Sequence, residues 1–359
     1  MLFGSGAFWG LMDISNLTER ETLVLESVVR NYILNAAPTG SRFVSKSGGL
    51  ELSPATIRNV MGDLEDKGLI ASPHTSSGRI PTDSGYRYYV DRMMESVILP
   101  LTVISQIRAE LTDLDSSDLH IVMEAASRAL SRATNHLGII LAPQLSDGIF
   151  RHIHIYPIGS RRHVIHITID SGFVKTLVVE IETSIDPASI ESACRIINER
   201  FYGFTLRDMF LNGKTAFSDV TNLELGIIRL FVPAIQKIME RNTSLDVLTN
   251  GTSRLLLKPD FADRDAMSTI LEILDEKNLL MHILSDGETA TSKTAIVSIG
   301  GEISEGRFNS FSVVKTGYAI GSLSGCLGVI GPKRMPYPYL VAAVEYTASA
   351  LEELYSGQF

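Results

Sequence analysis

A short helix whose two ends are both marked in the sequence lies in the stretch LSPATIRNVMGDLEDKGLI, residues 52–70. Ser53 is a favourable N-cap, Pro54 suits the first helical position, and Gly68 suits the left-handed residue that follows a helix. The apolar stripe of this helix consists of Ile57, Val60, Met61 and Leu64. We therefore predict a short helix that packs one face against a small domain and exposes the other.

Two further helices are predicted upstream of this one. Thr18 and Glu21 form a capping box, and the apolar residues that follow them recur at helical spacing. Pro38 and Gly40 are expected to end this first helix, and Ser41 is expected to cap a short second helix, RFVSK. The ordered part of the chain is therefore predicted to begin with three short helices.

The stretch PHTSSGRIPTDSGYRYYV, residues 73–90, follows the third helix, and its first half is small, polar and carries one cation, Arg79. Strands on either side of a turn, in which Gly78 takes a positive φ, are predicted to form a hairpin, and Thr82 is predicted to cap a fourth helix. Three helices followed by a hairpin are typical of a winged helix-turn-helix domain. We assign this domain to residues 17–100 and treat residues 1–16 as a poorly ordered extension.

The exposed face of the third helix is a candidate for entry into the major groove of double-stranded DNA. Arg58 and Asn59 lie on it, and these side chains suit the edges of guanine and adenine. Arg79 would lie over the DNA backbone or in a minor groove, and Arg87 is expected to be free for phosphates. The predicted DNA-binding residues are Ser41, Arg42, Ser53, Ala55, Thr56, Arg58, Asn59, His74, Thr75, Ser76, Gly78, Arg79 and Arg87. The alternatives are a solvated helix face and a hairpin that merely ends a domain.

The charge of the whole chain does not favour nucleic acid. The net charge is −9, but residues 40–92 hold seven basic and six acidic side chains, so the remainder carries −10. Cys194 and Cys326 are far apart and form neither a disulfide framework nor a metal-ligand spacing. No stretch has the length of a membrane span, and we expect a cytoplasmic protein with no membrane contact.

The remainder of the chain reads as sheet, helical block, sheet and helix, which predicts an α/β sensor-like domain interrupted by an inserted module. We place the sensor-like domain at residues 101–209 and 289–359 and the insert, mainly helical, at residues 210–288. One apolar stripe in the insert is predicted to contribute to a dimer contact. It consists of Met267, Ile270, Leu271 and Leu274.

Other chemistry is weakly marked. Four histidines in the run 149–169 suggest a metal site, but His163 and His166 would point to opposite faces of a strand and no fixed ligand spacing accompanies them. GKT at residues 213–215 lacks the first glycine of a phosphate-binding loop, because Asp208 stands there. No catalytic motif is present, so we expect no enzyme, no cofactor and no metal.

Several segments resemble HrcA, the heat-inducible transcription repressor family of bacteria. They are LTERETLVLESVVRNYI, PTGSRFVSKSGGLELSPATIRNVMGDLEDKGLI, PHTSSGRIPTDSGYRYYVDRMM and GVIGPKRMPYPYLVAAVEYTA. The resemblance implies an α+β multidomain fold with a winged helix, a GAF-like domain and an inserted dimerisation domain. It also implies a homodimer on an inverted-repeat operator, the CIRCE element of chaperone operons. The GroE chaperonin would restore active repressor, and heat would relieve repression. The alternative is a winged-helix regulator that senses a small molecule through the GAF-like domain.

Overall fold

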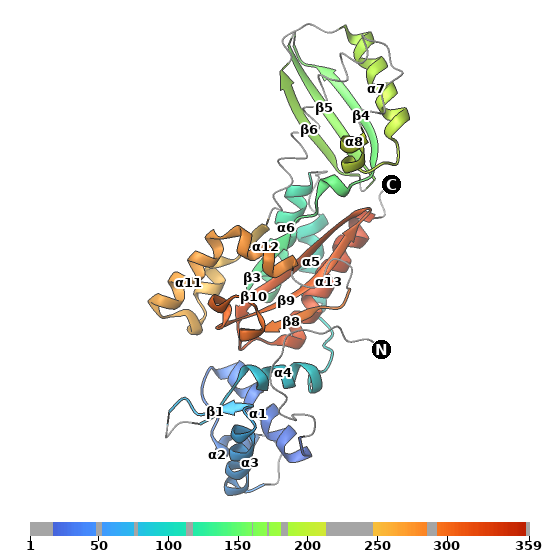
Figure 1. Ribbon diagram of the computed structural model, residues 1–359. Helices are drawn as coiled ribbons and strands as arrows, with labels where there is room; N and C mark the ends of the chain where they lie inside the picture. Colours follow the sequence, from blue (N-terminus) through green and yellow to red (C-terminus); the bar gives the residue numbers. More distant parts are fainter. Residues whose placement is uncertain are drawn as a thin grey trace. The chain divides into compact units, whose positions relative to one another are not determined.

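The computed structural model comprises two compact units (Figure 1). The described residues are 17–47, 52–74, 78–112, 118–159, 161–170, 172–180, 186–212, 247–285 and 293–356. The first unit comprises Met1–Ser96, Val297–Ser312 and Gly331–Pro338. The second unit comprises Val97–Ile296, Val313–Ile330 and Tyr339–Phe359. The expected extension, residues 1–16, lies outside the described residues.

The first unit contains the predicted winged helix-turn-helix. Its elements in chain order are α1 (Glu19–Asn35), α2 (Ser41–Ser47), α3 (Pro54–Asp66), β1 (Ile70–Ala71), β2 (Ile80–Pro81) and α4 (Asp83–Arg92). Strands β1 and β2 pair antiparallel, with Ile70 opposite Pro81 and Ala71 opposite Ile80. The order of three helices, a hairpin and a fourth helix confirms the prediction for this part of the chain.

The predicted helix ends of α1, α3 and α4 are confirmed. Thr18 and Glu21 form the capping box of α1, and Ser53 and Thr82 cap α3 and α4 through their side chains. Gly68 has a φ of +71°, and the N–H of Leu69 donates to the Leu64 carbonyl at 3.0 Å. Together with the bond from the Gly68 N–H to the Glu65 carbonyl, this forms a Schellman motif at the end of α3.

The turn between α1 and α2 differs from the prediction. Helix α1 ends at Asn35, because Ala36 takes the left-handed conformation before Pro38 is reached. Ser41 does not cap α2 but is its first residue, and the Gly40 carbonyl accepts the first helical hydrogen bonds. The side chain of Ser41 is buried. The expected cap was wrong because the backbone of Gly40 performs that role.

The core of the winged helix is made of the apolar stripes that the sequence displays. Its fully buried side chains include Val24, Leu25, Val28, Val29, Val44, Ile57, Leu64 and Leu69. Burying each such side chain contributes roughly 1.5–3 kcal/mol. The interior therefore holds α3 at a fixed orientation, with one face inward and the other in solvent.

Two segments from the C-terminal third of the chain also belong to the first unit. They contain the strand β8 (Ile296–Ile299), a 3-10 turn (Gly300–Glu302), a second 3-10 turn (Gly306–Phe308) and the segment Gly331–Pro338. Arg334 donates to the Ile33 carbonyl of α1 at 3.3 Å. The expectation that residues 17–100 alone form the domain is incomplete, because the segments Val297–Ser312 and Gly331–Pro338 also pack in this unit.

The second unit contains most of the helices and strands that the structure describes. Its helices are α5 (Leu101–Thr112), α6 (Leu119–Thr134), α7 (Pro187–Phe201), α8 (Leu206–Asn212), α10 (Thr252–Leu256), α11 (Arg264–Asp275), α12 (Lys277–Ser285) and α13 (Tyr337–Ser356). Short 3-10 turns occupy Leu145–Asp147 and Pro259–Phe261. Its strands are β3 (Leu137–Leu141), β4 (Phe150–Pro157), β5 (Arg162–Ile169), β6 (Val174–Glu180), β7 (Val247–Asn250), β9 (Phe311–Ile320) and β10 (Leu323–Pro332). The predicted cap of α7 is confirmed, with Asp186 as N-cap and Pro187 at the first position.

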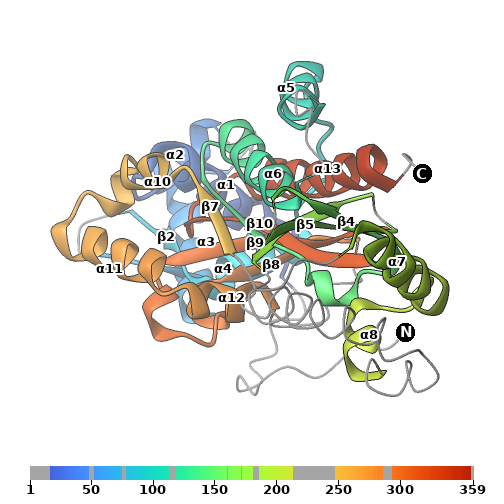
Figure 2. The ribbon, with the colours of Figure 1, turned by 90° about the horizontal axis from the view of Figure 1, so that it is seen from above.

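The strands form two separate sheets. A five-stranded sheet has the order β7-β3-β10-β9-β8, and a three-stranded antiparallel sheet has the order β4-β5-β6. Helix α7 runs along the three-stranded sheet beside β4, as both ribbon views show (Figures 1 and 2). The mixed α/β fold is as predicted, and the strands β4, β5 and β6 form a sheet of their own.

The limits predicted for the inserted module do not match this topology. Strands β3 and β7 pair directly, from Gly138 opposite Asn250 to Leu141 opposite Val247. The excursion from the five-stranded sheet therefore covers residues 142–246, not 210–288, and it includes the three-stranded sheet. Helix α12 packs against β3 and β7 instead of belonging to the excursion. Alternating patterns predict strands, but they do not say which strands pair.

The helix that carries the predicted dimer stripe, α11, uses part of that stripe internally. Ile270 is 1% exposed and therefore belongs to the core of the second unit. Met267 and Leu271, one turn apart, are 38% and 48% exposed, and Leu274 is intermediate. Only the first two remain candidates for contact with another chain. Within the described ranges, no helix combines the length and apolar character that crossing a bilayer requires.

Candidate nucleic-acid interface

Helix α3 presents a polar, exposed face to solvent. Ile57, Met61 and Leu64 are buried, whereas Arg58 and Asn59 are exposed, as the sequence predicts. Ala55 and Ser53 are also exposed, so the first turn is reachable. The side chains on this face are short apart from Arg58, which permits close approach of the helix to a ligand.

The beginning of α3 is electrostatically suited to an anion. The Ser53 hydroxyl accepts the Thr56 N–H at 3.1 Å, and no acidic residue lies in the first turn. Among the described residues, no carboxylate of the first turn therefore neutralises the partial positive charge of the helix N-terminus. Ser53 and Thr56 also bond each other through their hydroxyls at 3.0 Å, which orders the approach to the helix.

Helix α2, which packs against α3, carries two exposed cations. Arg42 and Lys46 are both exposed and lie four residues apart, so they share one side of the helix. The Ser45 hydroxyl donates to the Leu52 carbonyl at 3.0 Å, which ties α2 to the start of α3. Lys46 was absent from the predicted set, although its spacing from Arg42 marks it. Ser41, which was in the set, is buried and does not reach this surface.

The tip of the wing is only partly described. Thr75 and Ser76, both predicted to bind DNA, lie outside the described residues. His74 is exposed, and its carbonyl accepts a bond from the Ser72 hydroxyl at 2.7 Å. Gly78 is not among the glycines of positive φ, which corrects the prediction for the turn. Glycine is needed there for another reason: a Cβ would lie 2.5 Å from the Thr39 carbonyl.

Arg79 does not project from the wing as the sequence suggested. Its guanidinium pairs with the Glu65 carboxylate of α3 at 2.7 Å, and the side chain is only 26% exposed. The backbone of Arg79 exchanges hydrogen bonds with Thr39, at 2.8 and 2.9 Å. The other Glu65 oxygen accepts the Ser72 N–H at 3.1 Å, so this carboxylate holds both strands of the wing. The prediction that Arg79 is a free, projecting cation is wrong.

A chain of side-chain hydrogen bonds links Thr39 to α1. Thr39 is 1% exposed, and its hydroxyl accepts a bond from the Asn31 side chain at 2.8 Å. Asn31 in turn accepts a bond from Asn35 at 2.7 Å. Because buried polar groups are costly unless they are bonded, this chain fixes the turn against which the wing lies.

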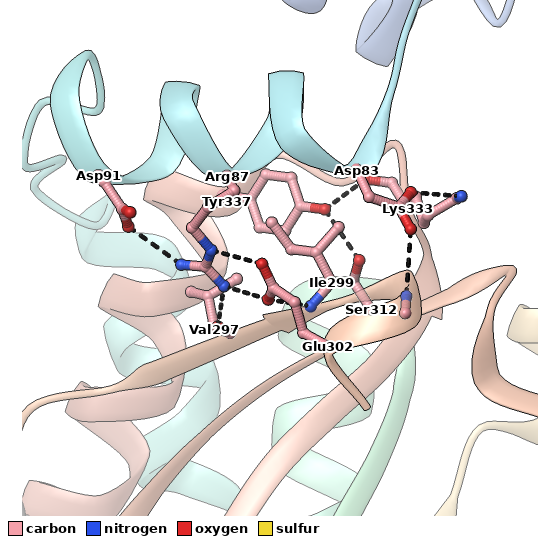
Figure 3. Close-up of polar contacts among 10 residues, drawn as sticks. Asp83, Arg87, Asp91, Val297, Ile299, Glu302, Ser312, Lys333 and Tyr337 are labelled. Carbon is pink, nitrogen blue, oxygen red and sulfur yellow. Dashed lines mark hydrogen bonds and ion pairs between the residues drawn. The ribbon is translucent and has the colours of Figure 1, made fainter. Parts of the chain in front are cut away.

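Arg87 is also engaged within the protein (Figure 3). It donates to both carboxylate oxygens of Glu302, and the distance from Arg87 Nε to Glu302 Oε1 is 2.7 Å. It also donates to the Asp91 carboxylate at 3.0 Å and to the Val297 carbonyl at 2.5 Å. Burial lowers the pKa of this guanidinium, but the bonds and charges of Glu302 and Asp91 outweigh it and raise the pKa overall. The prediction that Arg87 is free for phosphates is wrong.

A groove of about 600 Å³ lies elsewhere, between β4 and α7. Its polar lining includes His152, His154, Glu191, Arg195 and Asn198. The two imidazole rings lie 4.1 Å apart, and burial together with the charge of His154 lowers the pKa of His152. The described residues contain no cluster of three or more His, Cys, Asp or Glu side chains that could hold a metal.

Comparison with known proteins gives a consistent match. A family model described as the HrcA protein C terminal domain matches residues 120–341. Relatives named heat-inducible transcription repressor HrcA match nearly the full chain. That of Chlorobium phaeobacteroides (strain BS1) is 33% identical, and the match covers 95% of this chain and 99% of the relative. That of Geobacter sulfurreducens is 32% identical, with 96% and 100% covered, and that of Shouchella clausii is 33% identical, with 95% and 99% covered.

One solved structure shows the same fold. It is a crystal structure of a hypothetical protein, with a TM-score of 0.65 and 24% sequence identity. The match covers 95% of this chain and 99% of that one. The fold of the whole chain therefore has a counterpart of known structure.

Proposed function

The chain belongs to the HrcA family of heat-inducible transcription repressors, and we propose that it represses heat-shock genes by binding double-stranded DNA through α2 and α3. The observation that carries the proposal is the exposed face of α3 with Arg58 and Asn59, beside the exposed cations of α2. In winged helix-turn-helix domains, the exposed face of such a helix enters the major groove. The site of action is the cytoplasm.

Two kinds of contact follow from the chemistry of this face. Arg58 suits the O6 and N7 atoms of guanine, and Asn59 suits the N6 and N7 atoms of adenine, so these two residues would read bases. Arg42 and Lys46 would contact phosphates, together with the N-terminus of α3. Neither Arg79 nor Arg87 belongs to the DNA-facing set in this proposal, because both have partners within the protein.

The family resemblance supports a homodimer on an inverted repeat, the CIRCE element, with the GroE chaperonin maintaining active repressor. Two-fold symmetry in the protein matches two-fold symmetry in the operator, with half-sites spaced by the helical pitch. For the dimer contact we retain Met267 and Leu271, which are exposed, and remove Ile270, which is buried. Leu271→Glu, measured by light scattering, tests this choice: a persistent dimer would reject α11 as the contact.

The direct test is fluorescence anisotropy with an inverted-repeat duplex and a scrambled duplex of equal length, at stated salt. Wild-type protein should bind the inverted repeat preferentially, and Arg58→Ala and Asn59→Ala should reduce that preference. Arg20→Ala is the matched control, because Arg20 is an exposed arginine of α1 in the same unit. Equal binding of both duplexes by the wild-type protein would reject the proposal.

The ligand-gated alternative has one specific observation in its favour, the groove beside β4. If a small molecule controls the protein, it should raise the melting temperature, and Arg195→Ala together with His154→Ala should abolish that increase. A metabolite screen by thermal shift that yields no hit dependent on these residues would remove this alternative.

A further inference from the structure

We propose that the ion pairs Arg87–Glu302 and Asp83–Lys333 are positioning contacts that make the placement of the wing and of the end of α3 depend on the segments Val297–Glu302 and Lys333–Tyr337. This inference rests on the proposed function, in which α2 and α3 bind DNA and the wing follows directly on the end of α3. Nothing in the winged-helix pattern requires these contacts, because their partners lie more than two hundred residues further along the chain.

The first step of the argument is that α4 is fastened to the wing. The Thr82 N–H donates to the Leu69 carbonyl at 3.1 Å, and the Thr82 hydroxyl donates to the Gly68 carbonyl at 2.7 Å. At Gly85, an added Cβ would lie 2.0 Å from the Leu69 carbonyl oxygen. The start of α4 therefore touches the backbone at the end of α3 and the beginning of the wing. A displacement of α4 must displace these residues too.

The second step is that Glu302 holds the middle of α4. Its carboxylate accepts two bonds from the Arg87 guanidinium and a third from the Ile299 N–H at 2.8 Å (Figure 3). Paired bonds between a guanidinium and a carboxylate are directional as well as strong. The 3-10 turn that carries Glu302 is thereby fixed both to its own strand and to α4.

The third step is that Asp83 holds the beginning of α4. Its two carboxylate oxygens accept bonds from Lys333 Nζ at 2.6 Å and from the Gly301 N–H at 3.1 Å. Gly300 has a φ of +51°, and a Cβ there would lie 2.2 Å from the Asp83 carboxylate. Glycine at position 300 therefore allows the turn and leaves space for the aspartate. Asp83, Arg87 and Asp91 follow at four-residue intervals, so one face of α4 carries the charges that these segments complement.

The fourth step is that the same segments bury the aromatic side of α4. The rings of Tyr86 and Tyr337 meet edge to face with centroids 6.0 Å apart, and both side chains are at most 1% exposed. The Tyr337 hydroxyl bonds the Ser312 hydroxyl at 2.9 Å. The chain continues from Ser312, Gly331 and Pro338 into β9, β10 and α13.

The rival interpretation is that Arg87 contacts phosphate and Glu302 merely restrains it in the free protein. The two interpretations predict opposite signs. If Glu302 positions α4, Glu302→Ala weakens operator binding. If Glu302 only restrains a phosphate-binding arginine, Glu302→Ala strengthens binding and steepens its salt dependence.

The experiment is a double-mutant cycle with Arg87→Ala, Glu302→Ala and the double variant, each measured for operator affinity at several salt concentrations. We expect each single variant to lose about tenfold in operator affinity with an unchanged salt slope. The double variant should lose no more affinity than the single variant that binds the operator more weakly. Arg108→Ala with Glu353→Ala is the matched control, because this exposed ion pair belongs to the second unit. Independent, multiplied losses in the double variant, or a salt slope reduced by Arg87→Ala, would overturn the proposal.

Amide hydrogen exchange without DNA provides a second readout. Glu302→Gln should accelerate exchange in α4 and around Leu69, and leave α6 unchanged. If Glu302→Gln leaves exchange in α4 at the wild-type rate, the positioning role fails even in a folded protein. Should the wild-type protein fail to bind the inverted repeat while Glu302→Gln still loosens α4, the proposed function fails and the positioning role stands.

Discussion

The exposed face of α2 and α3 and the wing with α4 carry similar side chains but use them differently. Arg42, Lys46 and Arg58 point into solvent, whereas Arg79 pairs with Glu65 and Arg87 pairs with Glu302. The sequence predicted that Arg42, Arg58, Arg79 and Arg87 would all contact DNA. The comparison teaches that a basic side chain near a DNA-binding helix supports binding in two ways, by contact with DNA or by holding the element that makes contact.

The largest expected effect lies on the exposed face. Arg58→Ala should lower affinity for the preferred operator by roughly 10-fold or more, because a good bidentate base contact is worth about 1–3 kcal/mol. The measurement is anisotropy on the preferred duplex and on duplexes changed at single positions. A uniform loss on every duplex would assign Arg58 to phosphate instead of to a base and would weaken the comparison.

In the wing, the largest effect should come from crowding its backbone contact with α1–α2. Gly78→Ala places a Cβ against the Thr39 carbonyl, and overpacking of this kind costs typically about 1–3 kcal/mol. We expect a lower melting temperature and weaker operator binding together. Gly62→Ala is the control, because a Cβ there would meet no atom within 4 Å other than the neighbouring backbone of its own helix. Equal stability of the two variants would show that the wing is free to move away from Thr39.

A smaller effect is expected from the Glu65–Arg79 ion pair, which is partly exposed. Glu65→Ala and Arg79→Ala should each destabilise the protein by about 1 kcal/mol, and the double variant by less than the two effects added together, because the residues act as a pair. Urea unfolding followed by circular dichroism gives the three values. Full additivity would mean that the wing does not depend on this carboxylate.

The smallest expected effect concerns the pH dependence of the attachment of α3 to α1. The hydrogen bond from Lys67, at 2.7 Å, lowers the pKa of Glu21, with further bonds from Thr18, although burial opposes this. The stabilisation is present above the unfolded-state pKa of the carboxyl and is lost as pH falls through the lower, folded-state pKa. Wild-type protein should therefore lose more stability on acidification than Lys67→Met does. Parallel pH profiles of the melting temperature would contradict this.

Local signals in the sequence predicted the helix ends and the inward face of α3. The capping box of Thr18 and Glu21, the N-cap Ser53 and the C-terminal Gly68 all act within a few residues of one another, so spacing alone reveals them. The sheet order could not be obtained in this way, because the pairing of β3 with β7 joins residues separated by a long excursion.

The partners of the arginines were hidden for the same reason. Glu302 lies 215 positions from Arg87, and neither the alternation of its neighbours nor their charge points to α4. For Glu65 a signal was available: it lies in the last turn of α3, close to the wing in sequence. An acidic residue at that position can reach a cation in the following hairpin. This possibility could have led to the prediction that Arg79 pairs with Glu65 instead of projecting from the wing.

The central claim is that α2 and α3 supply the charges that DNA neutralises and that the arginines of the wing and α4 do not. The most direct measurement is the slope of the logarithm of operator affinity against the logarithm of salt concentration for wild-type protein, Lys46→Ala and Arg79→Ala. The account predicts that Lys46→Ala reduces the magnitude of the slope by about 0.9 for each phosphate that the protein no longer neutralises, whereas Arg79→Ala leaves it unchanged. A reduced slope for Arg79→Ala with an unchanged slope for Lys46→Ala would contradict it.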